Sequence, residues 1–289
     1  MASNTQTSSN RNGKILCVAN QKGGTGKTTT AWNLGYAIAK EGMSVLLVDF
    51  DPQANLTMGF GIENPLELET AMSEVLEIIM KGKETPDMSQ YIQKGEKPGM
   101  TLDLIPANQT LTITEVNLRN EMGGEHTLSE LLNPLREHYD FIIIDSNPFL
   151  GLLTINALTA CNEVIIPVSP QFWSATGLTD LIDTINKIKR KLNPKIKIGG
   201  ILLTICDERT TLYKHTRELV ETNYGGTAKI FNTAIPSTTK VGEANYYSLS
   251  VMEHDPSGKA SIAYMNMAKE VLGNVGIENK ETAKKNATA

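Results

Sequence analysis

The glycine-rich segment KGGTGKTT, residues 22–29, lies between a short apolar run and a stretch that fits an amphipathic helix. The preceding run KILCVAN, residues 14–20, has the composition of a buried strand, and the helical stretch covers residues 27–41. Glycines allow the backbone to bend so that consecutive N–H groups point at one anion, and the start of a helix adds the positive end of its dipole. A strand, a glycine turn and a helix in this order therefore predict a phosphate-binding loop in an α/β fold.

The polar positions of this loop have expected contacts with a nucleotide. Lys27 would reach the β- and γ-phosphates, and Thr29 would lie near the α-phosphate. The hydroxyl group of Thr28 would bind Mg²⁺. The cofactor-binding residues predicted in the loop are Gly23, Gly24, Thr25, Gly26, Lys27, Thr28 and Thr29. Pro236 is a further candidate, for contact with the base.

The loop departs from the strict pattern G-x-x-x-x-G-K-[ST]. Gln21 stands where that pattern has a glycine, and a second lysine, Lys22, precedes the paired glycines. On the residues alone, Lys22 is either a solvated surface lysine or an additional cation for the phosphates.

Short runs rich in Val, Ile and Leu recur along the chain and are apolar on both faces, as buried strands of a parallel sheet are. After the first run, the expected strands are residues 44–50, 102–107, 141–146, 163–169 and 198–206, with a weaker one at 228–236. The expected helices are residues 27–41, 126–138, 174–191, 209–223 and 257–272. Residues 61–100 are expected to hold variable helices and loops. The alternation predicts a mostly parallel, twisted sheet with helices on both faces.

Length and composition limit the class of protein. The chain has 289 residues, 40% of them hydrophobic, which suffices for one large core, and its net charge of −5 gives no global signature of nucleic-acid binding. We expect a flexible tail at residues 1–13, a single domain at 14–274 and a second flexible tail at 275–289. No run reaches the roughly 20 apolar residues of a membrane span. The three cysteines fit buried side chains in a reducing compartment, so we expect a cytoplasmic protein.

Three aspartates follow expected strands. Asp145 ends the run FIIID, and the carboxyl end of a strand beside a phosphate loop is where Mg²⁺ takes a further ligand. Asp49 and Asp51 follow the second strand in LLVDFDPQANLT. We expect Asp51 to orient the attacking water and Asp49 to support Mg²⁺. The alternative for this pair is turn formation, since Asp-Pro commonly opens turns.

With these motifs the chain resembles the ParA/Soj partition ATPases, which belong to the deviant Walker A type of P-loop NTPase that also includes MinD. The loop motif K-G-G-x-G-K-T-T is matched position by position at residues 22–29. LLVDFDPQANLT resembles the second motif of the family, YDFIIIDSNPFLG its Walker B segment, and residues 235–271 its C-terminal segment. The resemblance covers about residues 14–272 and implies a P-loop ATPase domain that uses ATP and Mg²⁺.

The resemblance also implies a role for Lys22. In this family the extra lysine reaches across a homodimer interface to the phosphates of the nucleotide bound by the partner, where a buried triphosphate needs more positive charge. Two departures lie in loops that respond to the nucleotide. Ser146 and Asn147 precede Pro148 where the family usually has a pair of prolines, and Ala54 stands where glycine is common.

Non-specific binding of the ATP dimer to double-stranded DNA is a further implication of the resemblance. Arg209 in CDERT and Lys240 in IPSTTKVGEA match basic positions of the family that contact DNA. The run KIKRKLNPKIK, residues 187–197, has six cations and is a second candidate. Its alternative role is to complement the dipole at a helix end.

The resemblance therefore implies a nucleoid-associated, ATP-dependent DNA partition ATPase that leaves DNA when a ParB-like centromere-binding partner stimulates hydrolysis. One alternative is a MinD-like membrane-associated positioning ATPase, which needs a cationic amphipathic helix at the C-terminus. Gly273 and Gly276 interrupt the candidate segment, residues 264–277. The other alternative is a non-hydrolysing nucleotide-dependent adaptor. Such a protein would lack Lys27 or the acidic residues, and all of these are present.

Overall fold

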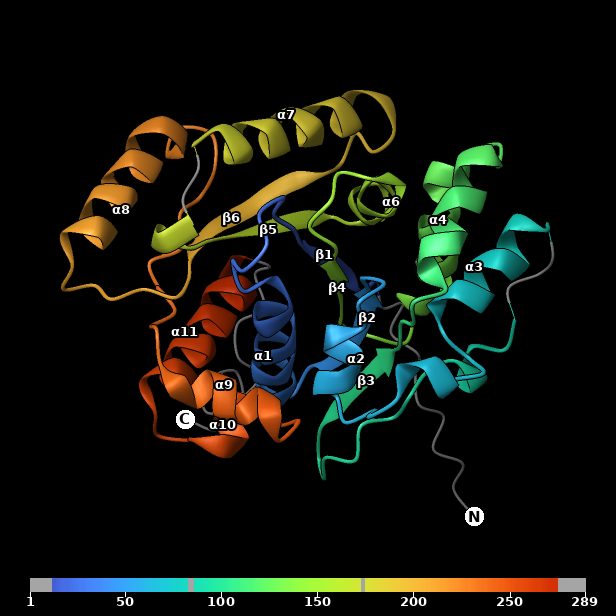
Figure 1. The fold of residues 1–289 in the computed structure, drawn as a ribbon, viewed down its shortest axis with the longest axis horizontal. Coiled ribbons are helices and arrows are strands. Elements are labelled where there is room, and N and C mark those ends of the chain that lie inside the picture. Colours follow the sequence, from blue (N-terminus) through green and yellow to red (C-terminus); the bar gives the residue numbers. More distant parts are fainter. Residues whose placement is uncertain (1–11, 83–85, 173–174, 275–289) are drawn as a thin grey trace, which may run out of the picture.

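The centre of the fold is a six-stranded sheet whose described pairings are all parallel. The structure is a computed structural model that describes residues 12–82, 86–172 and 175–274. The strands follow the order β3-β2-β4-β1-β5-β6. They are β1 (Lys14–Val18), β2 (Ser44–Phe50), β3 (Thr101–Ile105), β4 (Phe141–Ser146), β5 (Glu163–Val168) and β6 (Lys197–Leu203). The predicted parallel sheet is confirmed, and helices cover both of its faces (Figure 1).

The five expected helices are present, together with others that sequence periodicity did not reveal. The described helices are α1 (Lys27–Lys40), α2 (Asn55–Gly59), α3 (Met72–Met80), α4 (Leu111–Asn120), α5 (Thr127–Leu135), α6 (Leu152–Ala160), α7 (Ala175–Lys191), α8 (Thr211–Tyr224), α9 (Thr239–Tyr246), α10 (Val251–His254) and α11 (Lys259–Asn274). Helix α6 was missed because it is buried along most of its length and has no polar face to set a period. Helix α4 was missed because few of its residues are buried.

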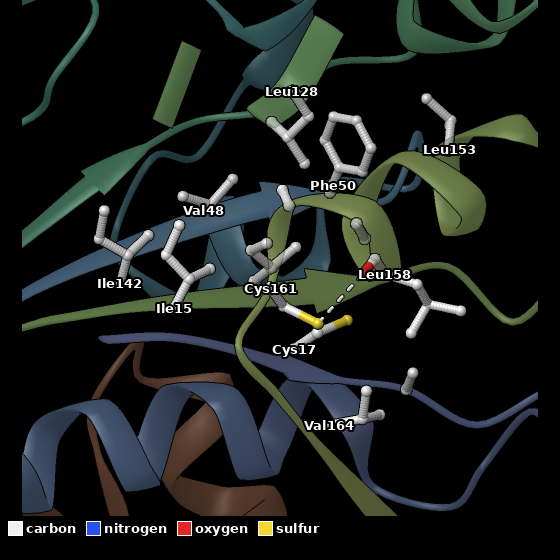
Figure 2. Packing of buried hydrophobic residues seen from close by; sticks show 14 of the residues in the cluster. Ile15, Cys17, Val48, Phe50, Leu128, Ile142, Leu153, Leu158, Cys161 and Val164 are labelled. Carbon is white, nitrogen blue, oxygen red and sulfur yellow. Dashed lines mark hydrogen bonds between the residues drawn. The ribbon is translucent and has the colours of Figure 1, made fainter. Parts of the chain in front are cut away.

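Both faces of the sheet are buried under separate apolar clusters. In β1, Ile15 and Cys17 pack with α3, α5, α6 and α7, whereas Leu16 and Val18 pack with α1 and α11. Figure 2 shows the first cluster, in which Cys17 and Cys161 lie close to each other beneath α6. All three cysteines are buried free thiols, as their apolar neighbours indicated. This two-sided burial is the reason that the strands read as continuous apolar runs.

The weak strand expected at residues 228–236 is not a regular strand. This segment runs beside β6 and forms two isolated parallel bridges, Ile201 with Ile230 and Cys206 with Pro236. Between the bridges, the backbone N–H groups of Asn232 and Thr233 donate to the carboxylate of Glu270 in α11. The acidic side chain therefore takes the donors that a continuous ladder would need.

The described secondary structure extends from Lys14 to Asn274. Most of the two expected tails, residues 1–11 and 275–289, lies outside the described residues, and so does the end of the segment weighed as a membrane helix. The division into one domain and two tails stays a prediction. Within the described ranges, no helix combines the length and apolar character needed to cross a bilayer.

Candidate nucleotide-binding site

The glycine loop joins β1 to α1 at the carboxyl end of the sheet. Gly24 and Gly26 have φ values of 75° and 80°, a left-handed conformation that favours glycine. Gly26 is the residue before α1, and no side chain caps the helix there. The first N–H groups of α1 are therefore available to an anion, as a phosphate loop requires.

Two polar side chains that the sequence analysis did not single out hold this loop in place. Asn20 donates to the carbonyl of Pro167 in β5 at 2.6 Å and accepts from the N–H of Lys22 at 3.0 Å. The hydroxyl of Thr204, just after β6, donates to the carbonyl of Thr25 at 2.8 Å. These bonds tie the loop to the neighbouring strands. Their only sequence signal is a polar residue directly after an apolar run.

The two lysines of the loop are in opposite environments. Lys27 is 7% exposed, and its Nζ donates to the carbonyl of Lys22 at 3.2 Å. Burial lowers the pKa of Lys27, while the nearby carboxylates of Asp145 and Asp51 act in the other direction. The side chain of Lys22 is exposed and forms no ion pair within the described residues. Lys27 is thus buried within the loop, whereas the Lys22 side chain is exposed to solvent.

Asp145 is a buried carboxylate without a protein partner. It ends β4 with no exposed surface, and neither of its oxygens has a hydrogen bond of good geometry to the described chain. Burial is the main cause that raises its pKa, Asp49 adds to the effect, and the nearby Thr28 hydroxyl and Lys27 oppose it. An unpaired buried carboxylate is costly, so this site calls for a cation. The oxygens of Asp145 and Thr28 fit the hard donor set of Mg²⁺.

Asp49 is committed to the protein instead. Its Oδ2 accepts from the N–H and the hydroxyl of Thr57 at 2.8 and 2.7 Å, and its Oδ1 accepts from the N–H of Asp51 at 3.2 Å. Burial raises the pKa of Asp49 to about 6 despite these bonds. The residue fastens β2 to the start of α2. A contact between Asp49 and Mg²⁺ stays a prediction.

An open pocket of about 550 Å³ lies over the loop. It brings together Lys27, Thr28 and Thr29 with Asp51, which is 8% exposed and accepts from the N–H of Gln53 at 3.0 Å. Other walls come from Thr112 and Glu115 of α4 and from residues 147–149. The sequence analysis did not predict helix α4, so it did not identify Thr112 and Glu115 as residues that line the pocket.

The altered loop after β4 is well anchored. The hydroxyl of Ser146 donates to the carbonyl of Val18 at 3.0 Å, and the Asn147 side chain accepts from Thr154 at 2.7 Å. Phe149 is 74% exposed on the rim of the pocket. The departures from the family pattern therefore connect the end of β4 to the last residue of β1 and to α6.

The remaining predicted residues lie away from this pocket. Pro236 pairs with Cys206 beyond the end of β6 and does not line the pocket over the loop. Arg209 is exposed and bonds to the carboxylate of Asp207 through Nε at 2.9 Å and its terminal nitrogen at 2.8 Å. Lys240 is also exposed and pairs with Glu243 at 2.7 Å.

This sheet, with a glycine loop, a buried lysine and a strand-end aspartate on its central strands, defines a P-loop ATPase. A family described as an AAA domain matches residues 13–198. The sporulation initiation inhibitor protein Soj of Bacillus subtilis (strain 168) is 38% identical over 262 residues, which are 91% of this chain and 99% of Soj. The chromosome partitioning protein ParA of Caulobacter vibrioides (strain NA1000 / CB15N) is 37% identical over 261 residues, 90% of this chain and 94% of that protein. The chain belongs to the ParA/Soj family of partition ATPases.

Solved structures support the same class and its cofactors. Cobyrinic acid a,c-diamide synthase from Mycobacterium smegmatis, solved with bound ADP and magnesium, has a TM-score of 0.78 at 32% identity and covers 91% of this chain and 96% of its own. The predicted family, the fold and the use of ATP and Mg²⁺ are thereby confirmed.

Proposed function

We propose that two copies of this chain hold ATP and Mg²⁺ between them, that the dimer binds double-stranded DNA without sequence preference, and that hydrolysis releases it. Partition of DNA by such a cycle requires that the nucleotide controls assembly. The dimer, the DNA contact and the stimulating partner are all part of the proposal.

The observation that carries the proposal is the contrast between Lys22 and Lys27. The main-chain carbonyl of Lys22 is held by the buried ammonium group of Lys27, whereas the Lys22 side chain is exposed and precedes Gly23 in the pocket wall. An exposed cation on such a loop is available to a phosphate that approaches from outside the subunit. This supports a nucleotide shared between two copies, with Lys22 of each copy on the triphosphate of the other.

Within one subunit, Lys27 and the first N–H groups of α1 would hold the phosphates. Thr28 and Asp145 would hold Mg²⁺, which neutralises charge on the phosphate oxygens when bound. Asp51 lines the same pocket as Lys27 and Thr28, which supports a role for its carboxylate in orienting the attacking water. Asp49 would act by holding β2 and α2 in position around these groups.

The DNA-binding and release steps follow from the family. Arg209 and Lys240 are both exposed, as contacts with a phosphate backbone require. A ParB-like centromere-binding protein would stimulate hydrolysis and so end the DNA-bound state. The changed residues Ser146 and Asn147 hold the end of β4 to β1, which leads into the glycine loop, and to α6, so they are expected to affect the rate of this step.

Co-sedimentation with DNA tests the proposal. The chain is incubated with non-specific duplex DNA and ATP, ADP or no nucleotide, and a parallel series replaces DNA by anionic lipid vesicles. Retention on DNA with ATP alone is expected. Retention on vesicles with ATP, and not on DNA, would favour a membrane-positioning ATPase instead.

A further inference from the structure

A second pocket lies at the opposite end of the sheet from the glycine loop. It has a volume of about 500 Å³ and is lined by the first residues of three adjacent strands, Lys14 of β1, Glu163 of β5 and Lys197 of β6. Because these strands are parallel, their amino ends share one edge, and the glycine loop lies at the other.

The lining of this pocket is strongly cationic. Its charged residues are Lys14, Arg136, Lys189, Lys195, Lys197 and Glu163. Lys14 is paired with Glu163 at 2.7 Å, and Arg136 donates to the carbonyl of Gly13 at 2.8 Å while keeping its charge. Five positive charges thus face one negative charge. From the basic run 187–197, the pocket includes Lys189 and residues 194–197.

Three of these cations have no carboxylate partner. Lys189, Lys195 and Lys197 are exposed and form no ion pair within the described residues. Arg209 and Lys240, which match the DNA-contacting positions of the family, differ in this respect. Arg209 is paired with Asp207, and Lys240 is paired with Glu243. A phosphate that approaches either of them must displace a carboxylate or meet its repulsion. A phosphate that approaches the pocket meets free ammonium groups.

We propose that this cationic pocket, formed by Lys14, Arg136, Lys189, Lys195 and Lys197, is a further contact of the chain with the phosphate backbone of duplex DNA, in addition to Arg209 and Lys240. This inference rests on the proposed function and adds a second surface to it. Free cations gathered on one surface give the counterion release that drives non-specific binding, whereas the net charge of −5 gives no overall attraction to DNA.

The position of the pocket suits a nucleotide-controlled dimer. Two copies joined at the carboxyl ends of their strands leave the amino ends on the outside. DNA bound there does not compete with the nucleotide or with Lys22. The pocket also spans β1, whose other end continues into the glycine loop, so both sites share one rigid strand.

The test removes the three free cations and measures DNA affinity over a range of salt concentrations with ATP and Mg²⁺. The pocket variant is Lys189→Gln, Lys195→Gln and Lys197→Gln. The matched control is Lys40→Gln, Lys214→Gln and Lys269→Gln, which removes three exposed lysines elsewhere and gives the same net charge. ATP hydrolysis is measured for each, since none of these residues lies in the nucleotide pocket.

The pocket variant is expected to bind DNA at least about tenfold more weakly than the control. The slope of log affinity against log salt concentration should be shallower by about 2 to 3 for this variant. Each lost phosphate contact reduces the slope by roughly 0.9, and three lysines are removed. Equal affinities and slopes for the two variants, with the parent bound to DNA, would overturn this inference and leave the proposed function intact. A parent that does not bind DNA with ATP would overturn both. Loss of binding to anionic vesicles by the pocket variant, with DNA binding unchanged, would also overturn it.

Discussion

Asp49 and Asp145 lie side by side in the parallel register of β2 and β4, yet only Asp49 has hydrogen-bond partners. Asp145 has none among the described residues. Burial raises the pKa of both carboxyl groups. The fold therefore holds the Asp49 carboxylate in hydrogen bonds that position β2 and α2. The Asp145 carboxylate lies near Thr28 without a hydrogen-bond partner, which is the predicted binding position of a metal ion.

Removing the charge of Asp145 should stabilise the chain when no nucleotide or Mg²⁺ is present. Both carboxyl groups have a folded pKa above the usual value, so their contribution to the free energy of unfolding is complete below about pH 4. For Asp49 it is lost as the pH rises through about 6, and for Asp145 it is lost as the pH rises through its own raised pKa. At pH 8, Asp145→Asn should raise the free energy of unfolding by about 1–3 kcal/mol. Urea unfolding at pH 4 and pH 8 measures this difference, which should shrink at pH 4.

The exposed Asp180→Asn variant is the control for this change in charge. With ATP and Mg²⁺ the order should reverse, because the parent gains a metal ligand that the Asp145 variant lacks. A variant at Asp145 that is less stable than the parent at pH 8 without ligand would show that this carboxylate has a partner in the apo chain.

Lys27→Ala should weaken ATP binding by about 100-fold or more, close to 3 kcal/mol, since a buried cation is removed from the phosphate loop. Titration calorimetry measures the affinity. Lys22→Ala is the matched control in the same loop, and at concentrations where the chain is monomeric it should bind ATP as the parent does. Similar losses for both variants would contradict the division of roles between the two lysines.

Asp51→Ala should leave ATP bound and slow hydrolysis by about 100-fold or more, the usual share of a residue that assists proton transfer or positions water. The readouts are nucleotide affinity and steady-state turnover. Gln53→Ala is the control, because it keeps the backbone N–H that contacts Asp51. Turnover of the Asp51 variant at the parent rate would remove this residue from the mechanism.

Ala54→Gly should change stability by less than about 1 kcal/mol. Ala54 precedes α2 with a φ of 53°, a left-handed conformation that costs a residue with a Cβ about 1 kcal/mol or more. Glycine removes this strain but also loses a buried methyl group and adds chain entropy. Ala37→Gly, inside α1, removes a buried methyl group without relieving backbone strain. It should therefore lower the free energy of unfolding by at least about 1 kcal/mol more than Ala54→Gly does. Equal losses of stability for the Ala54 and Ala37 variants, measured by thermal or urea unfolding, would contradict backbone strain at Ala54.

The strand, loop and helix around residues 22–29 were predictable because each has a strong local signal. Buried parallel strands are apolar throughout, and a glycine loop before a helix has few other uses. Helix α6 was not predictable, because a helix buried on all sides has no period. The segment 228–236 reads as a strand locally, but the N–H groups of Asn232 and Thr233 donate to Glu270 of α11, a tertiary contact that no local pattern indicates.

The roles of the predicted site residues stay a prediction, but the structure shows which features of their geometry the motifs could not indicate. Sequence motifs indicated Lys27, Thr28, Asp51 and Asp145. They did not distinguish the satisfied carboxylate of Asp49 from the unsatisfied one, since that depends on where Thr57 folds back. The anchoring bonds of Asn20 and Thr204, like the ion pairs of Arg209 and Lys240, depend on tertiary contacts or rotamers that no motif encodes.

The molar mass of the chain with Mg²⁺ and a non-hydrolysable ATP analogue tests the proposed dimer most directly. Light scattering should give twice the 31.6 kDa of one chain with the analogue, and a single chain with ADP. Lys22→Ala should bind the analogue and yet keep the mass of one chain. A parent that stays at 31.6 kDa with saturating analogue, or a Lys22 variant that dimerises as the parent does, would contradict a triphosphate held between two copies.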